Sequence, residues 1–329
     1  PEDVDLDRLE VEEVDEGVDE VLRHRLNHAR WGPSDGGAGG QLAPREADRG
    51  EVTVASTPVT STLPRPRAFI ADHGAKIMRY CGVSVVNVVT GPEADLGEAL
   101  VLSPLSDKIT FTGSSAVGSR IHQMCSESLK PVTLELGGKA ANIILDDADV
   151  DIAVNGSVFL VYYNQGQACI SGSRILVPRA MHDEFVEKMV ARTRDIAFGS
   201  LDDPMCTWGA LISQAHWDRV DAYVKGAIEQ GATLACGGGR PPGSPEEGFY
   251  YAPTVLTGVK HGMTISCEEV FGPVATIIPY DTVEEAIAIT NGVDYGLSNS
   301  IWSSDTDRAI AVARKLESGT VWINDGLLL

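Results

Sequence analysis

Residues 161–174 read VYYNQGQACISGSR, and the rest of the chain is organised around this stretch. Its centre, Cys169, lies among small and flexible residues, after one apolar segment (Val154–Tyr163) and before another (Ile175–Val177). Structural cysteines usually lie inside a periodic apolar pattern, whereas Cys169 interrupts two such patterns. The stretch therefore predicts a loop held between two packed elements, with a thiol that is available for chemistry. From these residues alone, a structural role and a chemical role for Cys169 both stay open.

Strands and helices alternate on both sides of this loop. The predicted strands are Val83–Val89, Lys108–Thr112, Val132–Leu136, Asn142–Leu145, Ile175–Val177, Val274–Pro279 and Thr320–Asn324. The predicted helices are Arg67–Tyr80, Ala94–Leu102, one from Ser115, Asp149–Tyr163, His182–Ile196, Ser213–Gln230, one capped by Thr282 with Glu285, and Asp305–Ser318. This alternation indicates an α/β fold with a parallel, doubly wound sheet, because parallel strands need crossover connections.

The composition excludes several classes of protein. The formal net charge is -21 and the isoelectric point is about 4.6, which argues against nucleic-acid backbones and anionic membranes as partners. None of the six cysteines forms a CxxC pair and no zinc-type spacing occurs, so we expect no disulfide framework, no metal site and a reducing, cytoplasmic location. The sequence has no run of about 18 apolar residues and no signal-peptide pattern, so we expect no membrane span.

The first 66 residues differ in amino-acid composition from the rest of the chain. Residues 1–20 hold eleven acidic residues and one arginine, and residues 32–50 hold six glycines and two prolines. Such segments bury too little apolar surface to form a core. We therefore expect residues 1–66 to be poorly ordered.

Two glycines and a carboxylate mark the ends of predicted strands. Gly113 and Gly118 lie in FTGSSAVG, between a strand and a helix, where backbone N–H groups can meet a phosphate. Their spacing differs from GxGxxG, so a tight strand–helix turn explains them equally well. Glu135 lies in LELGGK, where we expect partial burial to suit it to general-base duty and the following glycines to leave room for a ligand. An exposed strand-end glutamate before a turn is the alternative.

A fourth motif, EEVFGPV, covers Glu268–Val274. Carboxylates commonly hold ribose hydroxyls, and an aromatic ring can support a flat heterocycle. Glu269 and Phe271 therefore suit a nucleotide, although a loop that simply enters a strand explains the same residues.

Taken in order, FTGSSAVG, LELGGK, NQGQAC and EEVFGPV closely resemble the motifs of the aldehyde dehydrogenase superfamily. The resemblance runs from about Gly82 to Asp325, and the stretches FYYAPTVL and SGTVWIND extend it. It implies an aldehyde dehydrogenase-like α/β fold. A partial Rossmann-type, dinucleotide-binding cofactor domain is expected at 67–136, and an α/β catalytic domain with a parallel sheet at 137–329.

The resemblance also implies roles for single residues. Cys169 matches the family nucleophile, which attacks an aldehyde carbonyl, and Glu135 matches the general base for thioester hydrolysis. On the cofactor side, for NAD or NADP, the matching residues are Gly113, Ser114, Gly118, Leu136, Glu269 and Phe271. On the substrate side they are Tyr163, Ala168 and Ile170, an apolar wall that suits an aliphatic or aromatic aldehyde. The implied activity is oxidation of an aldehyde to a carboxylic acid through a cysteine thiohemiacetal and thioester.

The sequence departs from the family pattern towards both ends. No PWN-type motif is found, and the KPSE-type motif corresponds to VTVASTPVT, in which Val52 and Ala55 replace the Lys and the Glu. The resemblance implies a homo-oligomer, but the sequence stops after VWIND and GLLL, before the family's tail strand used in subunit pairing. Two alternatives to an active dehydrogenase stay open: an inactive fragment or pseudoenzyme, and a cofactor-independent thioester or ester hydrolase that uses Cys169.

Overall fold

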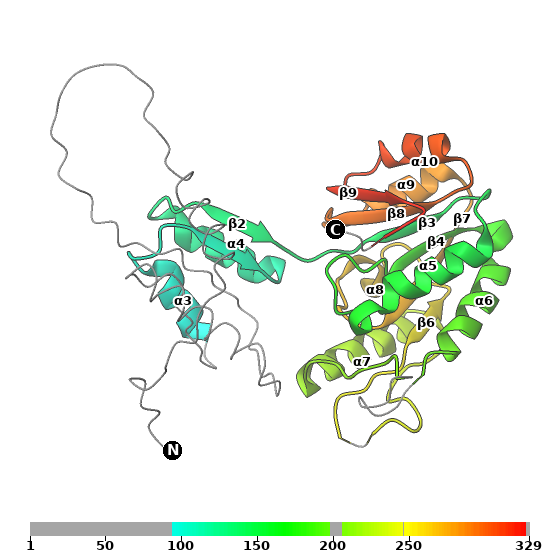
Figure 1. Cartoon of the computed structure of the whole chain (residues 1–329), viewed down its shortest axis with the longest axis horizontal. Helices are drawn as coiled ribbons and strands as arrows, with labels where there is room; N and C mark the ends of the chain where they lie inside the picture. Colours follow the sequence, from blue (N-terminus) through cyan, green and yellow to red (C-terminus); the bar gives the residue numbers. More distant parts are fainter. Residues whose placement is uncertain (1–93, 198–205, 246, 327–329) are drawn as a thin grey trace, which may run out of the picture. The chain divides into compact units, whose positions relative to one another are not determined.

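The computed structural model describes residues 94–197, 206–245 and 247–326. Their strands form one sheet of two strands and one of seven (Figure 1). The segment 1–66 and the elements predicted at 67–80 and 83–89 lie outside the described residues. The expected domain boundary after residue 136 stays a prediction.

The smaller sheet belongs to a strand–helix–strand unit. Its elements are α3 (Ala94–Leu102), β1 (Ile109–Thr112), α4 (Ser115–Ser126) and β2 (Val132–Glu135). β1 and β2 pair in parallel, as the crossover through α4 requires. The buried core of the unit consists of Val101, Ile109, Phe111, Ile121 and Cys125. Ser114 caps α4, because its hydroxyl accepts a hydrogen bond from the Val117 N–H (3.4 Å).

The larger sheet has the strand order β5-β6-β7-β4-β3-β8-β9. The strands are β3 (Ala141–Ile144), β4 (Arg174–Pro178), β5 (Thr233–Cys236), β6 (Thr254–Thr257), β7 (Val274–Tyr280), β8 (Ser298–Trp302) and β9 (Thr320–Ile323). Every neighbouring pair is parallel except β5 and β6. The expected parallel sheet is therefore confirmed except at this edge, where β5 runs antiparallel to β6 with an irregularity between Leu234 and Cys236.

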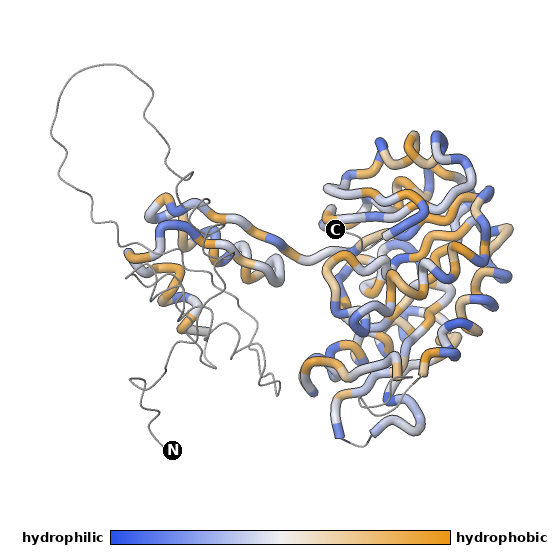
Figure 2. The backbone as a smooth tube through the Cα atoms, in the orientation of Figure 1, coloured by the Kyte–Doolittle hydropathy of each residue, from blue (hydrophilic) through white to orange (hydrophobic). Residues whose placement is uncertain are grey.

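Helices cover both faces of the larger sheet (Figure 1). The helices are α5 (Val150–Tyr162) and α6 (His182–Arg194) on one face, and α7 (Gln214–Glu229), α8 (Thr264–Cys267), α9 (Val283–Asn291) and α10 (Thr306–Ala313) on the other. Successive strand residues point to opposite faces. Ile175 and Val177 therefore join the cluster under α5 and α6, while Leu176 joins the cluster under the other helices. In Figure 2 the apolar residues recur along the same strands and helices.

Local signals place most of these helices correctly. Asp149, Ser213, Thr282 and Asp305 each accept hydrogen bonds from N–H groups of the first turn of a helix. The helix predicted at Asp305–Ser318 ends earlier, at Ala313, because turns lead from there into β9. The sequence patterns did not predict β5, β6 or β8.

Two helical glycines give a matched test of packing. A Cβ on Gly156 of α5 would lie under 3.0 Å from the Trp302 ring, whereas a Cβ on Gly226 of α7 would meet no atom within 4 Å. We expect Gly156→Ala to lower the free energy of unfolding by about 1–3 kcal/mol, the usual range for overpacking. Gly226→Ala is expected to raise it by about 0.5–1 kcal/mol, because alanine favours the helix. Urea denaturation measures both, and equal effects would contradict this packing of α5.

Candidate functional site

Three loops meet at the amino ends of three neighbouring strands. Gly138 precedes β3, Cys169 precedes β4 and Phe271 precedes β7, and the sheet places β7, β4 and β3 side by side. All three strands are parallel, so their amino ends lie at one edge of the sheet. Motifs as far apart as Gly138 and Glu269, which are separated by 131 positions, are brought together there.

A strained turn comes before the cysteine. Asn164, Gln165 and Gly166 have φ values of 51°, 56° and 69° within the 3₁₀ turn η2 (Tyr163–Gly166). The left-handed region costs a non-glycine residue about 1–2 kcal/mol, and such strain persists only where the surroundings enforce it. A Cβ on Gly166 would lie under 3.0 Å from the carbonyl of Gly272. Glycine at this position therefore lets the turn approach the loop before β7.

Cys169 lies partly exposed in the loop between this turn and β4. Its backbone carbonyl approaches Gly138 so closely that a Cβ there would lie under 3.0 Å from the oxygen. Burial raises the pKa of the Cys169 thiol, and the carboxylates of Glu269 and Glu135 raise it further. The N–H groups of Cys169 and Ile170 act in the opposite direction. The resting thiol is therefore protonated at neutral pH and needs a base to become a nucleophile.

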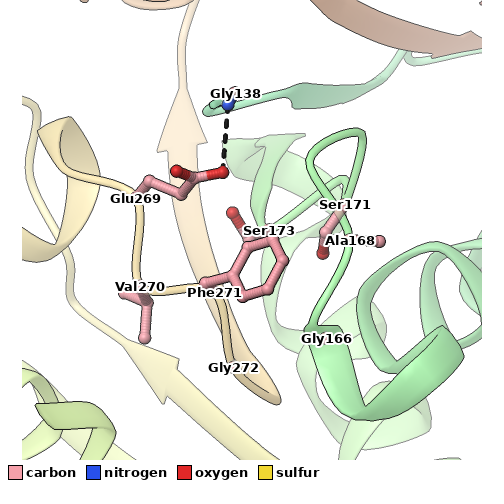
Figure 3. Close-up of a pocket in the computed structure, with 9 residues that line it drawn as sticks. All are labelled: Gly138, Gly166, Ala168, Ser171, Ser173, Glu269, Val270, Phe271 and Gly272. Atoms are coloured by element: carbon pink, nitrogen blue, oxygen red, sulfur yellow. Dashed lines mark hydrogen bonds between the residues drawn. The ribbon is translucent and has the colours of Figure 1, made fainter. Parts of the chain in front are cut away.

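Glu269 reaches over the glycine pair of LELGGK. The Gly138 N–H donates to its Oε1 (3.1 Å), the bond drawn in Figure 3. A Cβ on Gly137 would lie under 3.0 Å from the same carboxylate. The two glycines thus make room for the Glu269 side chain and the Cys169 backbone. The expectation that they leave room for a ligand stays a prediction.

A small cavity lies beside this carboxylate (Figure 3). It is lined by Gly138, Gly166, Ala168, Ser171, Ser173, Glu269, Val270, Phe271 and Gly272. Three residues predicted from the sequence, Ala168, Glu269 and Phe271, therefore meet at one place. Cys169 is not among the lining residues, and it adjoins the cavity through its backbone contact with Gly138.

Helix α7 holds the loop that carries Glu269 and Phe271. The His216 Nε2–H donates to the Phe271 carbonyl (2.6 Å), and the Arg219 guanidinium donates to the Glu269 carbonyl (3.0 Å). Burial lowers the pKa of His216, so the imidazole is neutral at pH 7 and its remaining proton lies on Nε2. The backbone of Phe271 is in the left-handed region, with a φ of 58°, and the residue is 38% exposed. The backbone of the loop is thus fixed while the ring stays accessible.

The residues expected on the substrate side lie before and after Cys169. Tyr163 is 55% exposed, and its ring lies 5.6 Å from the ring of Phe159, which is 51% exposed. Ala168 and Ile170 are partly exposed. Phe159 was not predicted, although its spacing of four residues before Tyr163 on a helix was visible. The two rings form an exposed apolar surface next to the cysteine loop.

Glu135 lies at the end of β2 with an exposed side chain. The expected partial burial is therefore wrong. β2 alternates between partly buried and exposed positions, and Glu135 shares the exposed side with Thr133. A carboxylate in this position is hydrated, so water molecules are available to it.

The expected phosphate-binding turn forms the start of α4. Ser114 caps the helix, and no acidic residue lies in its first turn, which leaves its positive end open to an anion. The Gly113 N–H donates to the Glu135 carbonyl (3.0 Å). Gly118 makes room for the Leu136 side chain, which would lie under 3.0 Å from a Cβ there. Gly118 and Leu136 therefore pack against each other, and cofactor contacts of all these residues stay predictions.

These groups fit a dinucleotide by their chemistry. Glu269 offers a carboxylate to ribose hydroxyls, Phe271 an accessible ring to a flat heterocycle, and α4 a capped N-terminus to a phosphate. Among the described residues, no group of three or more His, Cys, Asp or Glu side chains is placed to hold a metal ion. In the same part of the chain, every helix is too short or too polar to cross a membrane.

Sequence reasoning did not assign three residues of this region, His216, Arg219 and Lys139. The spacing of three between His216 and Arg219 was a visible signal for one helix face. Only the fold brings that face to the loop before β7. Lys139 was visible as the last residue of LELGGK, and its side chain is 3% exposed.

We compared the chain with known proteins. It has an α/β fold with a mostly parallel sheet, and the loop that carries Cys169 lies beside the loop that carries Glu269. The model of the aldehyde dehydrogenase family matches residues 68–328. Betaine aldehyde dehydrogenase of Bacillus subtilis (strain 168) is 41% identical over 254 residues, which cover 76% of this chain and 52% of that protein. The mitochondrial aldehyde dehydrogenase of Mesocricetus auratus is 42% identical over 257 residues, or 77% and 51% of the two chains.

Solved structures agree with these relatives. The NAD+ complex of aldehyde dehydrogenase from Bacillus cereus is similar with a TM-score of 0.76 at 37% identity, over 85% of this chain and 55% of that chain. The chain belongs to the aldehyde dehydrogenase family, and the resemblance seen in its motifs is confirmed. It spans about half the length of the curated relatives that it matches.

Proposed function

We propose that this chain oxidises an aldehyde to a carboxylic acid, with NAD or NADP as the hydride acceptor. The observation that carries the proposal is the meeting of Cys169 and Glu269 over the glycine pair at 137–138. In this proposal residues 67–136 contribute part of the cofactor domain, and residues 137–329 form the catalytic domain. The relatives named above support the reaction class.

Cys169 is the proposed nucleophile. Once a water molecule has taken its proton, the thiolate attacks the aldehyde carbon, a C–S bond forms, and the carbonyl π electrons move to the oxygen. The N–H groups of Cys169 and Ile170 already favour negative charge on the sulfur. They are the proposed donors for part of the oxyanion.

Three elements are proposed to hold the cofactor. Glu269 accepts hydrogen bonds from ribose hydroxyls, the Phe271 ring packs beside the nicotinamide, and Gly113 with Ser114 receives a phosphate at the start of α4. The bound nicotinamide supplies a hydride acceptor. The thiohemiacetal carbon on Cys169 would pass its hydride to that acceptor while an electron pair of its oxygen re-forms the C=O bond, which would leave a thioester.

Glu135 is the proposed base of the second half. Its exposed carboxylate takes a proton from a water molecule, which attacks the thioester carbon. The C–S bond breaks, the carboxylic acid leaves, and the Cys169 thiolate is restored. Tyr163 and Phe159, whose rings lie 5.6 Å apart, are proposed to guide an aliphatic or aromatic aldehyde towards the cysteine.

Glu135→Gln tests whether Glu135 acts only in thioester hydrolysis, while Cys169 forms the thioester. We expect the variant to form the thioester but to hydrolyse it about 10²–10⁴-fold more slowly, the usual contribution of a general base. Reduced nicotinamide should then appear in a burst of one equivalent per site, followed by a slow steady state. Glu127→Gln, at an exposed glutamate after α4, is the control and should behave as the wild type.

The same assay tests the proposed function as a whole. The purified chain is offered aliphatic and aromatic aldehydes with NAD or NADP, and reduced nicotinamide is measured. A folded chain that reduces neither nucleotide with any aldehyde would refute the oxidation. Ester hydrolysis without nucleotide, lost on Cys169→Ala, would favour a hydrolase instead.

A further inference from the structure

The side chain of Gln167 connects the turn before Cys169 to the start of α7. Its Oε1 accepts a hydrogen bond from the Ile212 N–H (3.0 Å), and its Nε2 donates to the Asn164 carbonyl (3.3 Å). These two partners define the orientation of the amide, because a backbone N–H requires an acceptor and a carbonyl requires a donor. Gln167 lies two positions before Cys169, and the proposed reaction steps leave it without a role.

Other hydrogen bonds of this turn stay within it. The Gln167 N–H donates to the Asn164 carbonyl (3.0 Å), and the Asn164 Nδ2 donates to the Gln167 carbonyl (3.0 Å). These bonds move with the turn and define its shape, whereas the bond from Ile212 determines where the turn lies relative to another element. Residues 164–166 of the turn are left-handed, so its conformation depends on the surroundings that hold it.

Ile212 has a defined position in the fold. The residue before it, Leu211, is 4% exposed, and its N–H donates to the Phe249 carbonyl (3.0 Å). The residue after it, Ser213, caps α7, because its hydroxyl accepts a hydrogen bond from the His216 N–H (3.2 Å). The Ile212 N–H is therefore held next to the helix from both sides along the chain.

The same helix holds the loop before β7. The His216 Nε2–H donates to the Phe271 carbonyl (2.6 Å). The Arg219 guanidinium donates to the Glu269 carbonyl (3.0 Å). The loop that carries Cys169 and the loop before β7 are thus both attached at α7. The distance between the nucleophile and the proposed cofactor residues depends on both attachments.

The turn and the loop before β7 also approach each other directly, at Gly166 and Gly272 (Figure 3). A Cβ on Gly166 would lie under 3.0 Å from the Gly272 carbonyl. A close contact of this kind limits how near the two loops can come, because it is repulsive at shorter distances. It does little to oppose their separation. The hydrogen bond from Ile212 to Gln167 is attractive and directional, so it opposes movement of the turn away from α7.

We propose that Gln167 is a positioning residue for Cys169: its side-chain amide fastens the turn to the Ile212 N–H and so sets the position of the nucleophile relative to the loop before β7. Gln167 acts through the turn and touches neither substrate nor reacting atoms. The consequence for the reaction rests on the proposed function. The bond between Gln167 and Ile212 does not depend on it.

Steady-state kinetics of the full chain tests the consequence. Gln167→Met replaces the amide by an apolar side chain of similar length. We expect kcat for aldehyde oxidation to fall about 10- to 100-fold, because displacement of a reacting group by about 1 Å can cost about 10²-fold. KM for NAD should stay within about 2-fold, because α7 still holds the loop before β7 through His216 and Arg219. A wild-type kcat in Gln167→Met would overturn the inference.

Two further variants show which contact of the side chain matters. Gln167→Glu keeps an acceptor for the Ile212 N–H but has no donor for the Asn164 carbonyl, so kcat at the pH optimum of the variant should stay within about 3-fold of the wild type. Gln167→Asn keeps an amide that is one methylene shorter, and it should lose as much activity as Gln167→Met. A loss in Gln167→Glu equal to that in Gln167→Met would mean that Gln167 acts only within the turn, which contradicts the proposal.

Gln165→Met is the matched control. Gln165 lies on the same turn, and its side chain packs against Gly209, where a Cβ would lie 3.4 Å from the Gln165 amide carbon. Methionine can keep this packing contact. We therefore expect kcat and KM of the wild type in this variant.

Hydrogen–deuterium exchange of the Ile212 N–H tests the bond without cofactor or aldehyde. A hydrogen-bonded amide exchanges only when its bond opens, and the net free energy of one such bond corresponds to about a 2- to 10-fold change in the open fraction. The Ile212 N–H should exchange faster by about this factor in Gln167→Met and Gln167→Asn. In Gln167→Glu and Gln165→Met it should exchange no faster than in the wild type. Equal exchange in the wild type and Gln167→Met would refute the bond.

The two measurements separate the inference from the proposed function. If the wild type reduces neither nucleotide while exchange at Ile212 depends on the acceptor at position 167, the bond is supported and the proposed oxidation fails. If the wild type oxidises aldehydes and Gln167→Met keeps its kcat, the inference is refuted and the proposed function stands.

Discussion

Cys169→Ala is expected to lower kcat/KM for aldehyde oxidation by about 10⁴-fold or more, because no covalent intermediate can form without the thiolate. The reduction of NAD or NADP by an aldehyde measures this loss. Burst and steady state should disappear together, unlike in Glu135→Gln. The cysteine lies on a surface loop, so the stability of the fold should change little.

Cys236→Ala is the matched control for this prediction. Cys236 is also free and partly exposed, but it lies on β5, at the sheet edge away from β3 and β4. It should keep the wild-type rate. A Cys169→Ala variant that oxidises aldehydes at a comparable rate would remove Cys169 from the proposed mechanism.

Alkylation gives a second measure that requires no cofactor. The raised pKa of Cys169 means that only a small fraction is thiolate at pH 7, so its labelling by iodoacetamide should be slow there. The rate should increase as pH rises through the raised pKa. Glu269→Gln removes one cause of the rise and should move the profile to lower pH. A profile at or below the ordinary pKa of a cysteine would contradict the burial argument.

The elements that sequence predicted best are those defined by local chemistry. The start of a helix can be predicted from its capping residue, as at Ser114, Asp149 and Ser213. The side chain of such a residue accepts hydrogen bonds from N–H groups in the first turn of the helix that follows it. The four motifs were visible for the same reason, since glycines and a cysteine interrupt apolar runs. Three of them, LELGGK, NQGQAC and EEVFGPV, converge because the strands that follow them are parallel neighbours in one sheet.

The elements that sequence missed depend on distant partners. β8 reads SNSIW, and its residues Ser298, Asn299 and Ser300 are buried. One of these polar side chains is satisfied by another strand, because the Asn299 Oδ1 accepts a hydrogen bond from the Ala141 N–H of β3 (2.7 Å). The Ser298 hydroxyl has no hydrogen-bond partner among the described residues. No local pattern reveals a partner so far away in sequence.

The same limit explains the errors in the site. Glu135 ends an apolar strand, which predicted burial, but the two-stranded sheet leaves that side of β2 exposed among the described residues. The glycine pair at 137–138 predicted room for a ligand, but it did not reveal that the Glu269 carboxylate and the Cys169 carbonyl lie against the pair. Arg219 and His216 required knowledge of where α7 lies. In each case the missing information was the neighbour across the sheet, rather than the residue itself.

Gly138→Ala is expected to be the more damaging of two changes within the glycine pair. Its Cβ would meet the backbone carbonyl of Cys169 and lie 3.4 Å from the Leu297 Cβ. Neither the backbone nor the start of β8 can move aside without displacing the cysteine loop. Displacement of a nucleophile by about 1 Å can cost about 10²-fold in rate, and the overpacking should cost about 1–3 kcal/mol of stability.

Gly137→Ala differs by one position and should behave differently. Its Cβ would meet the Glu269 carboxylate, the far end of a flexible side chain, which can rotate away. The fold should therefore stay within about 1 kcal/mol of the wild type, while Glu269 leaves the Gly138 N–H. We expect a higher KM for NAD with a smaller change in kcat, whereas Gly138→Ala should lower kcat.

Steady-state kinetics with urea denaturation of both variants separates these effects. The two substitutions add the same methyl group to neighbouring residues, so differences in helix propensity or hydrophobicity cannot account for a split between KM and kcat. Only the identity of the group that each methyl displaces differs, a cofactor-side carboxylate at 137 and the nucleophile's own backbone at 138. The same kinetic profile in both variants would therefore contradict the assignment of one glycine to Glu269 and the other to Cys169.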